Sequence, residues 1–184
     1  MPKLYIMCGI PGSGKTTYAH KFIQEHEEED IRYVSRDDIR FAILKDDDDY
    51  FAHEGAVFKK FIATLGQTLI DGFDVIADAT HLNRFSRRKL VEAIDKYTNE
   101  YEIVYIVMST PFQECLKRNE GRTGRALVSP TIVQQMRRSF EMPSMEDDPR
   151  VVDIIDIGLD FDKSYVEWPY QQEGEEDGRD MADQ

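Results

Sequence analysis

Short apolar runs alternate with amphipathic segments along most of the chain. The apolar runs at 3–8, 31–34, 74–77, 101–108 and 151–157 have the length and composition of β-strands. Between them, helix-type spacing of apolar positions occurs at 16–24, 37–44, 57–70 and 86–96, and Ser-Pro or Thr-Pro pairs start two later helices. This alternation predicts an α/β fold: a doubly wound parallel sheet of about five strands with helices on both faces. Sheets of this type bind ligands at the carboxyl ends of their strands.

Charge is distributed unevenly along the 184 residues. The net charge is −13, but residues 1–140 sum to −1 and residues 141–184 carry the remaining −12. The end of the chain is rich in Glu, Asp and Gly and has no aliphatic cluster, which is typical of a disordered segment. We therefore expect one domain over residues 1–160 and an acidic, disordered tail over residues 161–184.

Several function classes do not fit this sequence. The longest purely apolar run, 103–108, is too short to span a bilayer, and the first residues lack the long apolar region of a secretory signal. Cys8 and Cys115 lie far apart and have no metal-site spacing, so we interpret both as small buried residues. These features predict a cytoplasmic protein that does not interact with membranes.

Residues 9–16, Gly-Ile-Pro-Gly-Ser-Gly-Lys-Thr, match the phosphate-loop pattern GxxxxGK[ST] at every position. The pattern lies where it should, after a predicted strand and at the start of a predicted helix. Glycines allow backbone amides to turn toward phosphate oxygens, and the helix N-terminus adds partial positive charge. Lys15 can reach the β- and γ-phosphates, and the Thr16 hydroxyl can ligate Mg²⁺. The sequence thus predicts ATP and Mg²⁺ as cofactors, bound by Gly9, Pro11, Gly12, Ser13, Gly14, Lys15, Thr16 and Thr17.

A second polar element, Ser35-Arg36-Asp37-Asp38-Ile39-Arg40, follows the second predicted strand. Ser35 and Asp38 have the spacing of a helix capping box, which leaves Asp37 for chemistry. Asp37 and Arg40 are three residues apart and share a helix face. In a kinase, such a pair suits the acceptor: Asp37 as general base, and Arg40 as the group that holds an acceptor anion. The alternative is a surface ion pair of little consequence.

The third predicted strand also ends in polar residues. Asp78 lies at the strand end, where a carboxylate near the Mg²⁺ shell is expected. Thr80 and His81 could contact the acceptor or the γ-phosphate. Hydrogen bonding within the loop, with Asn83 as a helix cap, explains the same residues equally well.

Two clusters of basic residues follow. Arg84, Arg87 and Arg88 could bind nucleic-acid phosphates, or they could simply form a solvated helix face. Residues 117–125 are dense in arginine and glycine, and Arg118 and Arg122 are four apart. Mobile arginines of this kind can close over ATP as a lid and neutralise charge during transfer, although a basic surface loop is the alternative.

With these motifs in place, the sequence resembles the kinase domain of polynucleotide 5′-hydroxyl kinases of the phage and bacterial end-repair type, from about residue 1 to 143. The resemblance rests on residues 9–17, 35–40, 76–80, 116–122 and 128–130, and on Met136 and residues 140–143. It implies a P-loop kinase that acts on RNA or DNA 5′-hydroxyl ends. By this resemblance Asp37 is the general base, Arg40 holds the phosphate 3′ of the accepting nucleoside, and Thr80 lies near the transferring phosphate. Lys15, Arg118 and Arg122 hold the ATP phosphates, and Thr16 ligates Mg²⁺.

The sequence departs from this family at two points. His81 stands where many relatives have Asn. Residues 160–164, Asp-Phe-Asp-Lys-Ser, do not form the Asp-x-Asp-Gly-Thr motif of the 3′-phosphatase domain that some members carry. We therefore expect kinase activity without phosphatase activity.

Three functions remain in competition. A polynucleotide kinase needs cations beyond the reacting nucleotide, and the arginines at 40, 84, 87 and 88 favour this function; Arg40, Arg84 and Arg88 are the candidates for binding the substrate. A small-molecule kinase that phosphorylates a nucleoside, sugar or nucleotide sugar would share the phosphate loop, base and lid. A nucleotide-dependent switch needs no acceptor base, so the Asp37–Arg40 pair argues against it.

Overall fold

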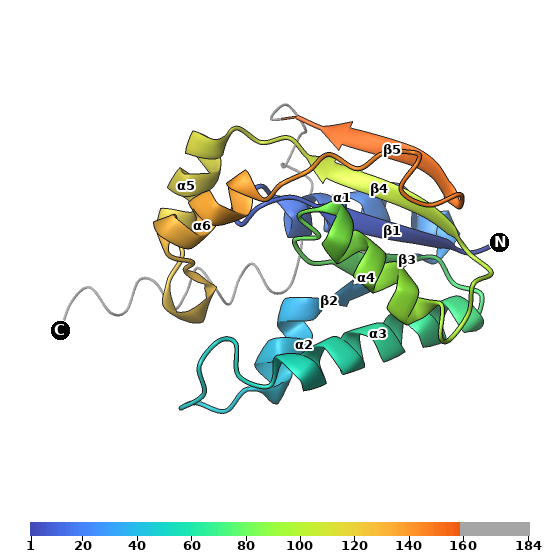
Figure 1. Cartoon of the computed structure of the whole chain (residues 1–184), viewed down its shortest axis with the longest axis horizontal. Coiled ribbons are helices and arrows are strands. Elements are labelled where there is room, and N and C mark those ends of the chain that lie inside the picture. The colour runs from blue at the N-terminus through green and yellow to red at the C-terminus, as the bar shows by residue number, and fades with distance from the viewer. Residues whose placement is uncertain (159–184) are drawn as a thin grey trace.

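The computed structural model describes residues 1–158 of the chain (Figure 1). The predicted acidic tail, residues 161–184, lies outside the described residues, so the domain boundary near residue 160 stays a prediction.

A parallel sheet of five strands forms the centre of the described region. Its spatial order is β2-β3-β1-β4-β5, and every neighbouring pair is parallel. The chain therefore moves to opposite sides of β1, which creates a switch point between β1 and its neighbours. This confirms the predicted doubly wound α/β fold. The strands are β1 (Lys3–Cys8), β2 (Arg32–Ser35), β3 (Val75–Asp78), β4 (Glu102–Met108) and β5 (Val151–Ile157).

Helices cover both faces of the sheet (Figure 1). Along β1, Leu4 and Ile6 pack into one core with α3 (Glu54–Ile70) and α4 (Arg84–Ile94), whereas Tyr5 and Met7 pack into the other with α1 (Lys15–Glu25). Burial on both faces is the reason that the central strands read as continuous apolar runs. The α-helices of residues 1–158 are α1 (Lys15–Glu25), α2 (Arg36–Ile43), α3 (Glu54–Ile70), α4 (Arg84–Ile94), α5 (Phe112–Glu120) and α6 (Pro130–Arg138); short 3-10 turns occupy Glu27–Glu29 and Gly124–Ala126.

Helix caps fix where the helices begin at the carboxyl edge of the sheet. The Ser35 hydroxyl accepts a hydrogen bond from the Asp38 backbone at 3.1 Å, so α2 begins directly after β2. Ser129 caps α6 in the same way, with Pro130 as its first residue. Asn83 and Ser86 form a capping box on α4. These caps bring the first turns of α2 and α4 to the edge where ligands bind.

One boundary differs from the prediction in a way that affects the site. The apolar stripe places the start of the long helix at residue 57, but α3 begins at Glu54. Glu54, Gly55 and Ala56 precede the first buried apolar residue, Val57, so hydrophobic spacing did not reveal them.

Candidate active site

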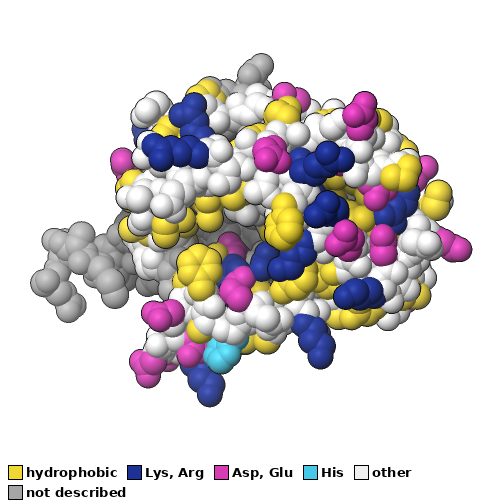
Figure 2. Space-filling view, viewed as in Figure 1, with side chains coloured by type: hydrophobic (Ala, Val, Ile, Leu, Met, Phe, Trp, Pro, Cys, Tyr) yellow, Lys and Arg dark blue, Asp and Glu magenta, His cyan; other side chains and the backbone are white. Residues whose placement is uncertain are grey.

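A cavity of about 620 Å³ opens at the carboxyl edge of β1, β2 and β3. Its walls come from the phosphate loop, the start of α2, the loop before α3, the end of β3, and the segment from Arg122 to Met136. Figure 2 shows the hollow in the surface, with hydrophobic and charged side chains around it. The predicted residues Pro11, Lys15, Thr16, Asp37, Arg40, Asp78, Thr80 and Arg122 all line this one cavity.

The phosphate loop packs closely against α5 at Gly12, a position where the structure requires glycine. Gly12 has a φ of +80°, and a Cβ atom there would lie 2.3 Å from the Cys115 carbonyl oxygen. Both the backbone conformation and the close approach of α5 therefore require glycine. The Arg118 guanidinium lies against the same loop, 3.5 Å from the Gly12 carbonyl oxygen, and donates to Glu114 at 2.8 Å.

The Lys15 ammonium is folded over the phosphate loop. Its Nζ donates to the Ile10 carbonyl at 2.9 Å, and burial lowers the pKa of Lys15 below its usual value. The negative charge of Asp78 raises the pKa of Lys15, and the positive charge of Arg122 lowers it further. Both charges are therefore close enough to Lys15 to affect its protonation. A phosphate chain bound here would supply the negative charge that favours the protonated lysine.

Thr16, Asp78 and Tyr33 form a hydrogen-bonded group beside Lys15. The Thr16 and Tyr33 hydroxyls both donate to Asp78 Oδ2, each at 2.6 Å. Asp78 is 6% exposed. The sequence predicted that Thr16 and Asp78 both lie near Mg²⁺, but it did not predict a role for Tyr33. Tyr33 lies within β2 and belongs to no motif, so nothing in the sequence singled it out. Within residues 1–158 no cluster of three or more acidic, His or Cys side chains could hold a metal by itself.

The donor set at Thr16 and Asp78 fits Mg²⁺ held together with a nucleotide. Mg²⁺ in such sites takes one or two protein oxygens and completes its shell with phosphate oxygens and water. One hydroxyl and one carboxylate, next to a phosphate loop, provide that arrangement.

Asp37 is the exposed carboxylate on the other side of the cavity. Its Oδ1 accepts hydrogen bonds from Arg40 and from the Tyr50 hydroxyl, the latter at 2.7 Å. Among residues 1–158 no partner binds Oδ2, and the side chain is 57% exposed. Asp37 is thus oriented through one oxygen and open to an acceptor through the other.

Arg40 is fixed by groups that the sequence pattern did not reveal. Besides Asp37, its guanidinium donates to the Tyr50 hydroxyl at 2.8 Å and, through Nε, to Glu54 at 3.1 Å. Glu54 also accepts from Arg36 at 2.7 Å. The predicted Asp37–Arg40 pair is therefore part of a larger network, and Tyr50 and Glu54 are residues that only the folded chain brings into the site.

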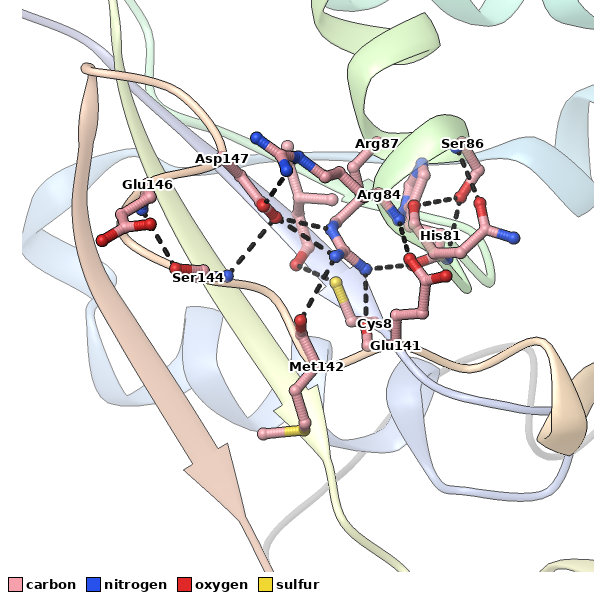
Figure 3. A network of polar contacts seen from close by, with 12 residues as sticks. Cys8, His81, Arg84, Ser86, Arg87, Glu141, Met142, Ser144, Glu146 and Asp147 are labelled. Carbon is pink, nitrogen blue, oxygen red and sulfur yellow. Dashed lines mark hydrogen bonds and ion pairs between the residues drawn. The ribbon is translucent and has the colours of Figure 1, made fainter.

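The region around α4 gives a different result (Figure 3). Arg87 is 1% exposed and donates to Asp147 at 3.1 Å and to the Glu141 carbonyl at 2.9 Å. Both interpretations of Arg87, as a phosphate-binding residue and as part of a solvated face, are wrong. The helix turns this residue inward, where its charge holds the segment before β5.

The other two arginines of α4 lie outside the main cavity. Arg84 pairs with Asp147 at 3.4 Å and Arg88 with Glu92 at 3.5 Å, and both side chains are largely exposed. They line a separate cavity of about 210 Å³. The structure does not bring them to Asp37, so their role in substrate binding stays a prediction.

His81 is part of the packing of its loop. It is 6% exposed and its Nδ1 lies 2.8 Å from the Met7 carbonyl oxygen. Burial lowers the pKa of His81 to about 4, which keeps the ring neutral. His81 thus has a structural contact to β1 and Asn83 is the predicted cap of α4, whereas the neighbouring Thr80 lines the cavity.

The comparisons with known proteins agree with this site. Residues 4–143 match the AAA_33 family model, described as an AAA domain. The chain belongs to this family. It is a P-loop kinase domain, with a phosphate loop in its expected place and structural neighbours that include a chain of an RNA repair complex and a sugar kinase.

Three solved structures illustrate the range of these neighbours. A chain of the Pnkp1/Rnl/Hen1 RNA repair complex is 29% identical with a TM-score of 0.63, over 75% of this chain and 43% of that one. The chain here thus spans less than half the length of that protein. A sugar kinase from Janibacter sp. HTCC2649 is 15% identical with a TM-score of 0.60, over 89% and 88%. Kti12 from Chaetomium thermophilum, in complex with ADP-AlF3, is 16% identical with a TM-score of 0.61, over 86% and 90%.

The last two similarities show the fold alone. In the part of the chain that the structure describes, no helix is long and apolar enough to span a bilayer.

Proposed function

We propose that this chain is an ATP-dependent polynucleotide kinase that transfers the γ-phosphate to the 5′-hydroxyl end of RNA or DNA. The observation that carries the proposal is the position of Asp37, whose carboxylate is open to an acceptor in the same cavity as Lys15 and Thr16. The 29% identity to a chain of an RNA repair complex supports a nucleic-acid acceptor.

The residues divide between donor and acceptor. Lys15, the loop amides and Arg122 would bind the ATP phosphates, and Arg118 would join them from its place against the loop. Thr16 and Asp78 would hold Mg²⁺, which offsets charge on the β- and γ-phosphates when bound.

Asp37 then acts on the acceptor. Its open carboxylate oxygen accepts the 5′-hydroxyl proton while the hydroxyl oxygen bonds to the γ-phosphorus. The bond from that phosphorus to the bridging oxygen breaks, and ADP leaves. Arg40, next to Asp37, would hold the first phosphate of the acceptor strand.

A small-molecule kinase is the second candidate. Arg84 and Arg88 lie outside the main cavity, which leaves Arg36, Arg40 and Arg122 as its arginines among the residues whose side chains are described. A compact acceptor, such as a nucleoside or sugar, would need no cation farther away.

The decisive experiment follows labelled γ-phosphate from ATP and Mg²⁺ to a set of acceptors. These are a 5′-hydroxyl oligoribonucleotide, the matching oligodeoxyribonucleotide, a nucleoside 3′-monophosphate, a nucleoside and gluconate. We expect labelling of at least one oligonucleotide, and none with Lys15→Ala. Labelling of only the nucleoside or sugar would favour the second candidate. A 3′-phosphorylated oligonucleotide run alongside should keep its phosphate.

A further inference from the structure

Three aromatic side chains form an exposed group at the acceptor side of the main cavity. They are Phe41 from α2 and Tyr50 and Phe51 from the loop before α3, and all three line the cavity. We propose that this aromatic ledge stacks against the nucleobase of the nucleotide that receives the phosphate. The inference rests on the proposed function and names the part of the substrate that this side of the site recognises.

The ledge is ordered by its own ring contacts. Tyr50 and Phe51 pack edge to face with centroids 4.9 Å apart, and Phe41 meets Tyr50 at 6.1 Å. Even so, Phe41 is 40% and Phe51 58% exposed. Large apolar rings held in water at the rim of a polar cavity are favourable places for a planar ligand to bind.

The ledge is linked directly to the proposed base. The Tyr50 hydroxyl donates to Asp37 Oδ1 at 2.7 Å, and the Arg40 guanidinium lies 4.3 Å from the centre of the Tyr50 ring. In a nucleotide, one ribose carries both the 5′-hydroxyl and the base. An acceptor whose hydroxyl reaches Asp37 therefore brings its base to within one sugar of these rings.

The topology assigns the ledge to the acceptor and not to the adenine of ATP. The phosphate loop follows β1, whereas α2 and the ledge follow β2, and β3 lies between these two strands. The donor phosphates bind at β1, so the β2 side is where the acceptor approaches. Aromatic stacking tolerates any base, which suits an enzyme that acts on ends of varied sequence.

The test compares two 5′-hydroxyl oligonucleotides that differ only in the first residue, one with its base and one abasic. We expect wild type to favour the base-bearing end by about tenfold in kcat/KM, the size of one stacking contact. Phe51→Ala should bring that ratio close to one and leave the KM for ATP unchanged, while Phe51→Trp should preserve the ratio. Phe85→Ala is the matched control, because Phe85 is 67% exposed on α4 and does not line the cavity.

Each failure has its own signature. If wild type labels neither oligonucleotide, the proposed function is wrong and the ledge with it. If wild type labels both equally, or if Phe51→Ala keeps the wild-type ratio, the ledge does not bind the base although the kinase proposal stands. If Phe51→Ala raises the KM for ATP and leaves the acceptor ratio alone, the rings serve the donor, which also overturns the inference.

Discussion

Helices α2 and α4 look alike in sequence, and each buries one ion-paired arginine, but the two arginines border different parts of the molecule. Each follows a strand of the sheet and begins at its carboxyl edge with a side-chain cap. On α2, Arg40 is only 4% exposed, but it lines the cavity beside the open carboxylate of Asp37. On α4, Arg87 is buried against Asp147 and supports the segment before β5. Both arginines pair with carboxylates, so the difference lies in what surrounds the pair: a cavity next to Arg40 and packed chain around Arg87.

The largest effect should come from Arg87→Ala. Arg87→Ala removes the buried partner of Asp147, which is only 8% exposed and keeps its contact with the exposed Arg84. Breaking a buried ion pair in this way costs about 3–5 kcal/mol of unfolding free energy. Thermal unfolding should shift downward by roughly 10 °C for a chain of this size. Arg88→Ala, which breaks only an exposed pair with Glu92, is the control and should change stability by less than about 0.5 kcal/mol. Equal stability of the two variants would contradict a structural role for Arg87.

His81, in the loop before α4, makes the stability of the fold depend on pH. Because burial lowers its folded pKa to about 4, below the usual 6.5, the unfolded chain takes up a proton that the folded chain refuses. Stability from this residue is full above pH 6.5 and is lost as pH falls toward 4, by up to about 3 kcal/mol. His81→Asn should flatten that part of the curve, and Asn tolerates the φ of +40° there. Denaturant unfolding at several pH values measures the slope; a variant as steep as wild type would refute the assignment.

Arg40→Ala should act on the acceptor and not on ATP. Loss of a hydrogen bond to a charged group lowers kcat/KM for the oligonucleotide by about 10- to 100-fold. The KM for ATP should change little, since Arg40 contacts α2, α3 and the loop between them and not the phosphate loop. Arg36→Ala is the matched variant, because Arg36 shares Glu54 but does not bind Asp37. Steady-state kinetics with each substrate varied measures both effects, and an equal loss for both substrates would contradict a role confined to the acceptor.

The smallest effect is expected from Arg84→Ala and Arg88→Ala. If these exposed arginines bind phosphates farther along the strand, the KM for a long oligonucleotide should rise by a factor of about two to five, with no change for a dinucleotide. The salt dependence of binding should weaken by about 0.7 in slope for each phosphate that the variant no longer binds. An unchanged salt slope would mean that Arg84 and Arg88 form a solvated face. In that case no arginine of α4 would bind the substrate.

The fold and the donor half of the site were predictable from local patterns. Apolar runs predicted all five strands, and one uninterrupted motif placed Lys15 and Thr16 at the start of the helix that follows β1. Asp78 followed from its place at the end of β3. Each of these rests on neighbouring residues in the sequence.

The rest depends on contacts between distant segments. Tyr33 reaches Asp78 across 45 positions, and Arg87 meets Asp147 across 60. Tyr50 and Glu54 come from a loop and a helix start that have no motif, so nothing local linked them to Asp37. The burial of Arg87 in particular could not be predicted, because helix spacing leaves open whether a polar partner lies on the inner face.

The central claim is that Asp37 is the acceptor base, and single-turnover transfer by Asp37→Asn tests it most directly. Asparagine keeps the shape and an oxygen for Arg40 and Tyr50 to contact but cannot take the hydroxyl proton. With ATP and a 5′-hydroxyl oligonucleotide both saturating, we predict transfer about 10²- to 10⁴-fold slower than wild type. ATP affinity and thermal stability should remain as in wild type. Transfer within tenfold of wild type would contradict the claim and remove Asp37 from the chemistry.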